Sequence, residues 1–130
     1  MDKRKLQDMY MDYLRGEGYR PEIDKDGDVL FKYEGGTYFI FVDHEDTQFF
    51  RIVYPNFYSI DTEAERQQVL RATDYATGST KVAKVFTIRD RVWASVELLL
   101  PSPDDFRPVF GRGMRTLRTA VMSFAEKMRE

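Results

Sequence analysis

Lys81-Val-Ala-Lys-Val-Phe-Thr-Ile88 and Val92-Trp-Ala-Ser-Val-Glu-Leu-Leu-Leu100, separated by Arg89-Asp90-Arg91, are two runs typical of β-strands. Successive side chains of a strand point to opposite faces of its sheet. In the second run, one face carries only apolar residues: Val92, Ala94, Val96, Leu98 and Leu100. The other face carries Trp93, Ser95, Glu97 and Leu99. The pattern predicts a β-hairpin that needs helices to cover it.

The strongest helical pattern follows this hairpin. Ser102-Pro103-Asp104-Asp105 combines a helix cap, a proline and early acidic residues, and Pro108 is expected in the first turn of the long helix. Apolar residues then recur at helical spacing: Phe110, Met114, Leu117, Val121, Phe124 and Met128. Gly113 within this segment predicts close approach to another backbone. Burial of the six side chains, at about 1.5–3 kcal/mol each, would make this helix a main support of the fold.

The first half of the chain predicts one helix and a meander of strands. The helix has an apolar stripe and ends at Gly16 and Gly18: Leu6, Met9, Tyr10, Tyr13 and Leu14. The expected strands are 19–24, 29–34, 37–43 and 48–54, with tight turns at Asp26-Gly27 and Gly35-Gly36 and an end at Pro55-Asn56.

A further helix is predicted from Thr62 to Gly78. Thr62 and Glu65 have the spacing of a capping box. The stripe on this helix is thin and made mostly of small residues: Val69, Ala72, Thr73 and Ala76. The predicted fold is therefore α+β, a single antiparallel sheet with packed helices in the order α-β-β-β(-β)-α-β-β-α.

Composition indicates one domain covering residues 1–130, because a chain of this length can bury an adequate core. The net charge of −2 offers no general attraction to nucleic acid or anionic lipid. With no cysteine, the chain has no disulfide, thiolate nucleophile or sulfur-bound zinc. Residues 1–6 lack the apolar segment of a signal peptide, and no stretch is long enough to cross a membrane. A cytoplasmic location without membrane contact is expected.

Two polar segments could suggest chemistry, but each has a simpler explanation. In Asp24-Lys-Asp-Gly-Asp28, a calcium loop would need Gly and Glu where Val29 and Gly35 stand, so a hairpin turn is favoured. His44 is the single histidine, and no Ser or Lys at motif spacing accompanies it. We therefore expect no catalytic site, no metal site, no cofactor and no enzymatic activity.

The aromatic residues of the strands are more informative, because they occur on both faces. A sheet with one wet face would carry polar residues at every second position. The expected outward surface, a candidate interface with another protein, consists of Phe39, Phe41, Phe50, Ile52, Trp93 and Leu99. The same aromatics could instead line a small-molecule pocket or stack on single-stranded nucleic acid. Nucleic acid is the less favoured alternative, since the basic surroundings and the Lys/Arg-Gly-Phe/Tyr signature of such platforms are missing.

A second candidate surface lies on the last helix. Arg112, Arg115 and Arg118 are three residues apart and fall broadly opposite the apolar seam. Such a row is usually a solvated helix face. The alternative is a docking strip for an acidic partner.

The helix–strands–helix–strands–helix order resembles the class I type III secretion chaperones, and more specifically the YbjN-type bacterial domains that share their fold. The stretches that carry the resemblance are 75–86, 92–100 and the apolar helix through Phe124 and Met128, together with Asp26-Gly-Asp-Val-Leu-Phe31 and Tyr33-Glu-Gly-Gly36.

The resemblance implies a small module, acting as a homodimer, that binds segments of other proteins in a chaperone-like or regulatory role. YbjN-type domains are described as putative sensory-transduction regulators. The family has no catalytic motif, and its binding patches are not fixed by a motif, so no binding residue carries over.

Overall fold

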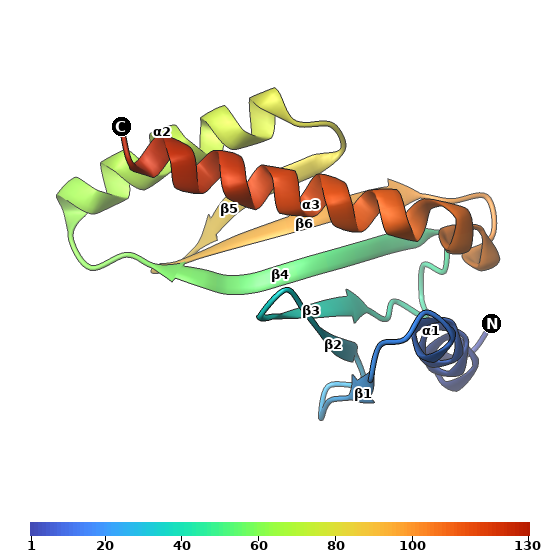
Figure 1. The fold of residues 1–130 in the computed structure, drawn as a ribbon. Helices are drawn as coiled ribbons and strands as arrows, with labels where there is room; N and C mark the ends of the chain where they lie inside the picture. The colour runs from blue at the N-terminus through green and yellow to red at the C-terminus, as the bar shows by residue number, and fades with distance from the viewer.

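Six antiparallel strands form one sheet, and three α-helices pack on one of its faces (Figure 1). The computed structural model describes all 130 residues. The elements, in chain order, are α1 (Lys3–Gly16), β1 (Glu22–Ile23), β2 (Val29–Tyr33), β3 (Gly36–Phe41), β4 (Phe49–Ser59), α2 (Glu63–Ser79), β5 (Ala83–Ile88), β6 (Arg91–Leu99), the 3₁₀ turn η1 (Pro103–Phe106) and α3 (Arg107–Met128). The predicted α+β class with a single antiparallel sheet is confirmed.

The strands lie side by side in the order β1-β2-β3-β4-β6-β5. The predicted hairpin is β5–β6, in which Phe86 pairs with Trp93 and Val85 with Ala94. Because β6 pairs with β4 along its other edge, the hairpin continues the sheet that the first four strands begin. Helix α2 connects β4 to β5 and covers the β5 end of the sheet.

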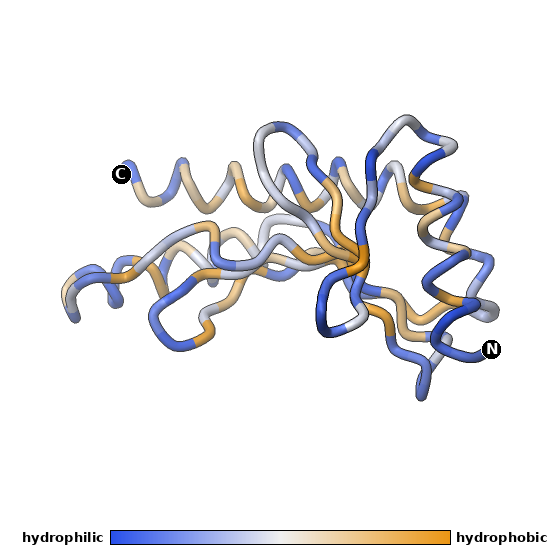
Figure 2. Tube along the Cα trace, turned by 90° about the horizontal axis from the view of Figure 1, so that it is seen from below, coloured by the Kyte–Doolittle hydropathy of each residue, from blue (hydrophilic) through white to orange (hydrophobic).

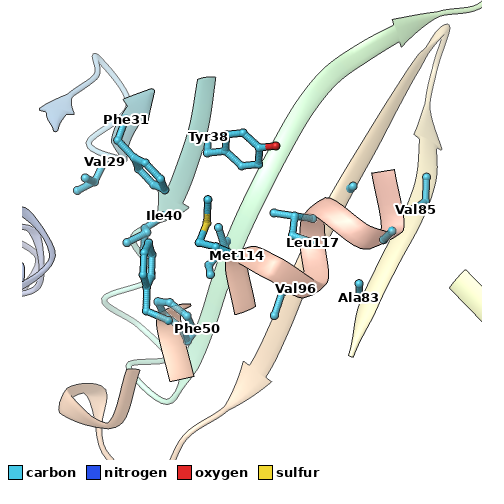
Figure 3. Packing of buried hydrophobic residues seen from close by; sticks show 14 of the residues in the cluster. Val29, Phe31, Tyr38, Ile40, Phe50, Ala83, Val85, Val96, Met114 and Leu117 are labelled. Carbon is cyan, nitrogen blue, oxygen red and sulfur yellow. The ribbon is translucent and has the colours of Figure 1, made fainter. Parts of the chain in front are cut away.

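The core lies between the sheet and the helices. Phe110, Met114, Leu117 and Phe124 of α3 are each at most 2% exposed, and the α3 trace alternates between hydrophobic and hydrophilic residues (Figure 2). Met114 and Leu117 lie over the buried side chains of the central strands (Figure 3). These four residues of the predicted seam are confirmed as core, whereas the other two, Val121 and Met128, are partly buried and pack against it.

Small residues bring the helices close to their neighbours. The predicted stripe of α2 is buried, although the helix ends at Ser79, one residue beyond the expected Gly78. A Cβ added at Gly113 would lie 3.1 Å from Cδ1 of Ile52 and 3.8 Å from Cγ1 of Val96. Gly113 therefore approaches side chains of β4 and β6, and the expectation of a backbone contact was wrong.

Several predicted strand ends differ from the structure: β5 begins at Ala83, two residues after the expected Lys81, and two further differences involve turns. The β2–β3 turn is centred on Glu34 and Gly35, which both have positive φ, of 49° and 81°, and Gly36 begins β3. Strand β4 does not stop at Pro55-Asn56. It passes through a bulge at which Asn56 has a φ of 54°, and pairing with β6 resumes at Tyr58. A bulge tolerates a proline because one residue there is left out of the hydrogen-bond ladder.

Gly36 is needed for packing. A Cβ at this position would lie 2.7 Å from the Tyr54 hydroxyl and 2.8–2.9 Å from its ring. That ring is held by stacking on Tyr38, with centroids 4.3 Å apart, and on Phe57, at 5.2 Å. Tyr54 therefore has little freedom to move away.

We predict that Gly36→Ala lowers the free energy of unfolding by about 1–3 kcal/mol, the usual cost of overpacking. Gly16→Ala is the control, because nothing lies within 4 Å of an added Cβ there. Urea denaturation measures both. In the Tyr54→Leu background the clash disappears, so Gly36→Ala should cost less there; equal costs in both backgrounds would refute the packing explanation.

Candidate protein-binding surface

The face of the sheet that the helices leave uncovered is largely apolar. Cross-strand partners share a face, and the pairs on this side include Leu30–Phe39, Phe39–Val53, Phe49–Leu99 and Phe86–Trp93. Most of their side chains are half-buried by one another, and none is covered by a helix. We call this surface the uncovered face.

Four aromatic rings form its centre. Phe41 lies 5.9 Å from Phe39 and 6.2 Å from Trp93, and Trp93 lies 6.4 Å from Phe86, all between centroids. The indole N–H of Trp93 donates a hydrogen bond of 3.0 Å to the Asn56 side chain at the β4 bulge. The bulge therefore helps to fix the orientation of the tryptophan.

Leu99 is the most exposed large apolar side chain of the protein, at 79%. It stands at the end of β6 beside Phe49, its partner on β4. Ile88, at the opposite end of the hairpin, is 41% exposed. Apolar area therefore extends from the aromatic centre towards both ends of the hairpin.

Polar side chains also lie on this face, and most of them are paired. Glu97 accepts hydrogen bonds from Ser95, at 2.7 Å, and from Lys84, at 2.9 Å. The Arg51 guanidinium lies 5.0 Å from the centroid of Phe41 and 5.1 Å from that of Phe49. Burial by itself raises the pKa of Glu97, but the hydrogen bonds from Ser95 and Lys84 and the charges of Lys84 and Arg51 outweigh it, so the net pKa is lowered.

Basic residues outnumber acidic ones on the uncovered face, in contrast to the net charge of −2 of the chain. The strand registers place Lys32, Arg51, Lys84 and Arg91 on this side, against Glu22 and Glu97. The uncovered face therefore carries a small net positive charge, which any partner of this surface must accommodate.

The structure divides the predicted interface residues between the two faces. Phe39, Phe41, Trp93 and Leu99 lie together on the uncovered face. Phe50 and Ile52 do not; they are 2% and 0% exposed, beneath the helices, and their outward placement was wrong. The register explains the difference, because Ile52 pairs with Ile40 and Val96, which point into the core, whereas Arg51 pairs with Phe41.

The same register identifies members of the surface that the sequence did not reveal: Leu30, Phe49, Arg51 and Phe86. Val53 lies on the same side of the sheet but is 2% exposed. The signal for these residues was alternation with core residues in β2, β4 and β5. With apolar residues at nearly every position of β4, however, alternation alone does not tell which set faces out. The pairing of β4 with β3 and β6 shows which set of its side chains faces outward.

The three arginines of α3 lie on the helical side of the sheet, away from the uncovered face. Arg112 and Arg115 are exposed, as predicted, and neither forms an ion pair. Arg118 is half-buried and lies 4.0 Å from the carboxylate of Glu34 in the β2–β3 turn. The three arginines therefore differ, because Arg118 has an acidic partner and the other two do not.

The Asp24–Asp28 segment is the hairpin turn between β1 and β2. The Asp24 carboxylate accepts hydrogen bonds from the backbone amides of Asp26 and Asp28, and Gly27 has a φ of 87°. His44 is exposed in the loop after β3. No group of three or more His, Asp and Glu side chains is placed so as to hold a metal ion.

The sequence also allowed a small-molecule pocket lined by the aromatic residues of the strands, and neither of the following two cavities has such a lining. The largest cavity, about 370 Å³, is lined by aliphatic and polar side chains between α3 and the sheet. A cavity of about 310 Å³ near His44 contains one aromatic residue, Phe41.

None of the α-helices is sufficiently long and apolar to cross a bilayer.

Comparison with known proteins supports the fold alone. No family model and no curated protein matches the chain. A crystal structure of an uncharacterized protein from Methanothermobacter thermautotrophicus is similar, with a TM-score of 0.59 and 12% identity, over 95% of this chain and 99% of that one. The two chains therefore share an α+β architecture along nearly their whole length.

The lowered pKa of Glu97 predicts a dependence of stability on pH. A carboxylate with a depressed folded-state pKa stabilises the protein above its unfolded value, near 4.5, and this contribution is lost as pH falls through the folded pKa. We expect Glu97→Gln to be less stable than the wild type at neutral pH, by less than about 1 kcal/mol for so open a site. Urea denaturation should show this gap closing below about pH 4. A gap independent of pH would contradict the assignment.

Proposed function

We propose that the chain is a non-enzymatic protein-binding module that acts as a homodimer, with the uncovered face as the interface. The observation that carries the proposal is the position of all three α-helices on one side of a sheet whose other side is rich in aromatic and aliphatic residues. Leu99, at 79% exposure, is the large apolar side chain that would lose the largest exposed fraction on contact with a partner.

The size of the face supports a dimer of moderate affinity. The four strands β3, β4, β6 and β5 are six to eleven residues long. At about 4.8 Å between strands they cover a projected area on the order of 400–700 Å². Two copies together would bury about 1,000 Å², the lower limit for a specific interface. We therefore expect the dimer to dissociate on dilution.

The charges of the face are compatible with pairing of two copies. In a two-fold interface, each residue of one copy meets the complementary residue of the other. Arg51 and Glu97 are cross-strand partners near the middle of the face, so rotation about an axis between them can bring Arg51 of one copy to Glu97 of the other. The excess basic residues, Lys32 and Arg91, would then lie at the rim, where water screens them.

The chaperone-like or regulatory part of the proposal rests on the resemblance to class I type III secretion chaperones and YbjN-type domains, together with the order of the elements. A dimer formed through the sheets would leave both helical layers exposed, with Arg112 and Arg115 available to an acidic protein segment.

Single-stranded nucleic acid is the second candidate for the same face. Phe39, Phe41 and Trp93 form a cluster of rings of the kind on which bases stack, and the local excess of basic residues would attract phosphates. Trp93 is the single tryptophan of the chain, so its fluorescence reports directly on either occupant.

The first test is the solution mass by light scattering across a dilution series. We predict a species of twice the 15.4 kDa chain mass that dissociates on dilution. Leu99→Asp should leave the protein folded and monomeric, because it places a charge in the interface. Leu70→Asp is the matched control, since Leu70 is 42% exposed on α2, away from the face, and should leave the dimer intact.

A wild type that stays monomeric at high concentration, or a Leu99→Asp variant as dimeric as the Leu70→Asp control, would refute the interface. Salt-sensitive quenching of Trp93 fluorescence by an oligothymidylate would favour the second candidate.

A further inference from the structure

A notch at the edge of the sheet creates the largest cavity of the protein. The β5–β6 pairing begins at Ala83 and Val96, while β6 continues to Leu99 with β4 alone at its side. The first turns of α3 pass over this point. Because β5 begins opposite Val96, no strand lies beside Leu98 on that edge of β6. We call the space left there, below α3, the notch.

The cavity has a volume of about 370 Å³ and an apolar interior. Its aliphatic surface comes from Val96 and Leu98 of β6, Val109 of α3 and Val82 at the start of the hairpin. Gly113 also lines the cavity, at a point where an added Cβ would lie 3.1 Å from Cδ1 of Ile52. The volume lies in the range of small-ligand sites.

A polar cavity of about 350 Å³ adjoins it and shares Lys81, Arg112 and Thr116 as lining residues. Arg115 also lines the polar cavity, and no acidic side chain lines either one. Each of the six ion pairs of the protein is formed by other residues, so Lys81, Arg112 and Arg115 retain uncompensated charges.

Four hydroxyl groups line the polar cavity, and one of them is free to donate a hydrogen bond to a ligand. Those of Ser79, Thr80 and Thr119 already donate to helix carbonyls. The hydroxyl of Thr116 has no such bond, and Thr116 lies at the junction of the two cavities. An anion placed there would meet one free hydroxyl donor and three cationic side chains.

Val82, which lines the apolar cavity, has a strained backbone conformation. Its φ is 51°, a strained value for a β-branched residue, and it is 59% exposed. A tight turn in which the Ala83 amide donates to the Lys81 carbonyl, at 2.6 Å, holds it there. The turn places an exposed aliphatic side chain next to the cationic Lys81, at the boundary of the two cavities.

From this arrangement we propose that the notch between α3 and β5–β6 binds a small amphipathic anion, a carboxylate or phosphate that carries an aliphatic chain. The chain occupies the apolar cavity and the anionic head lies between Lys81, Arg112 and Arg115 with Thr116. The planar guanidinium of Arg112 suits the paired oxygens of either head group. The site lies on the helical side of the sheet and is independent of the dimer interface.

The test is a calorimetric titration with decanoate, and separately with decyl phosphate, both below the concentrations at which they form micelles. We expect saturable binding of one molecule per chain to at least one of them. Decanol keeps the tail without the charge and should bind at least about tenfold more weakly, the usual effect of losing one hydrogen bond to a charged group. Acetate keeps the head without the tail and should also bind at least about tenfold more weakly, because it has no aliphatic chain to bury in the cavity.

Lys81→Ala and Arg112→Ala should each weaken binding about tenfold, for the same reason. Arg118→Ala is the matched control, because Arg118 is on the same helix but faces Glu34; it should bind as the wild type does. Thermal melting checks that each variant is folded, and Leu99→Asp should bind normally, which separates this site from the dimer.

Three results would overturn the proposal: no saturable binding of either anion, equal binding of decanol, or equal weakening by Arg118→Ala and Arg112→Ala. In the first case, binding to vesicles of anionic lipid would indicate a membrane-surface charge effect in place of a site for a single anion.

Discussion

The packing of α3 across one face of the sheet is the interaction on which the rest of the structure depends. The helix is 22 residues long, about 33 Å at 1.5 Å per residue, and contacts a different group of aromatics at each end. Phe110 lies 5.4 Å from Tyr13 of α1, and Phe124 lies 5.6 Å from Phe57 near the β4 bulge. One continuous seam thus joins α1, the strands and α2, and Gly113 lets the helix approach the sheet closely enough to do so.

The consequence is an asymmetric sheet. All of the helical covering lies on one side, and none of the elements in residues 1–130 covers the other. An exposed sheet face normally alternates polar residues with the buried apolar ones, but β3 and β6 present Phe39, Phe41, Trp93 and Leu99 there. Hydrophobic burial of such residues would be worth about 25 cal/mol per Å², a gain that remains unrealised without a partner. This imbalance is a stronger argument for a binding surface than any single residue.

The sequence was sufficient for the element order, the antiparallel sheet and the α3 seam, because each depends on local periodicity. It was insufficient where the result depends on pairing between distant segments. Phe50 and Ile52 could not be assigned to the core without the register of β4 against β3 and β6. Likewise, the need for glycine at position 36 depends on Tyr54, a residue 18 positions away. The cavity beside Leu98 follows from where β5 begins, which its own residues do not indicate.

The uncovered face and the notch use opposite sides of the same strand, since Leu98 faces α3 and Leu99 faces away from it. Coupling between two such sites would require an element with two alternative arrangements that both occupants bias. Strand β6 is unsuited to that role, because its residues 91–99 pair with β4 on one side and residues 91–96 pair with β5 on the other. A ligand in the notch would fill a space that already exists beside a fixed strand. Occupation of the two surfaces should therefore contribute additively to stability, and each can be studied without the other.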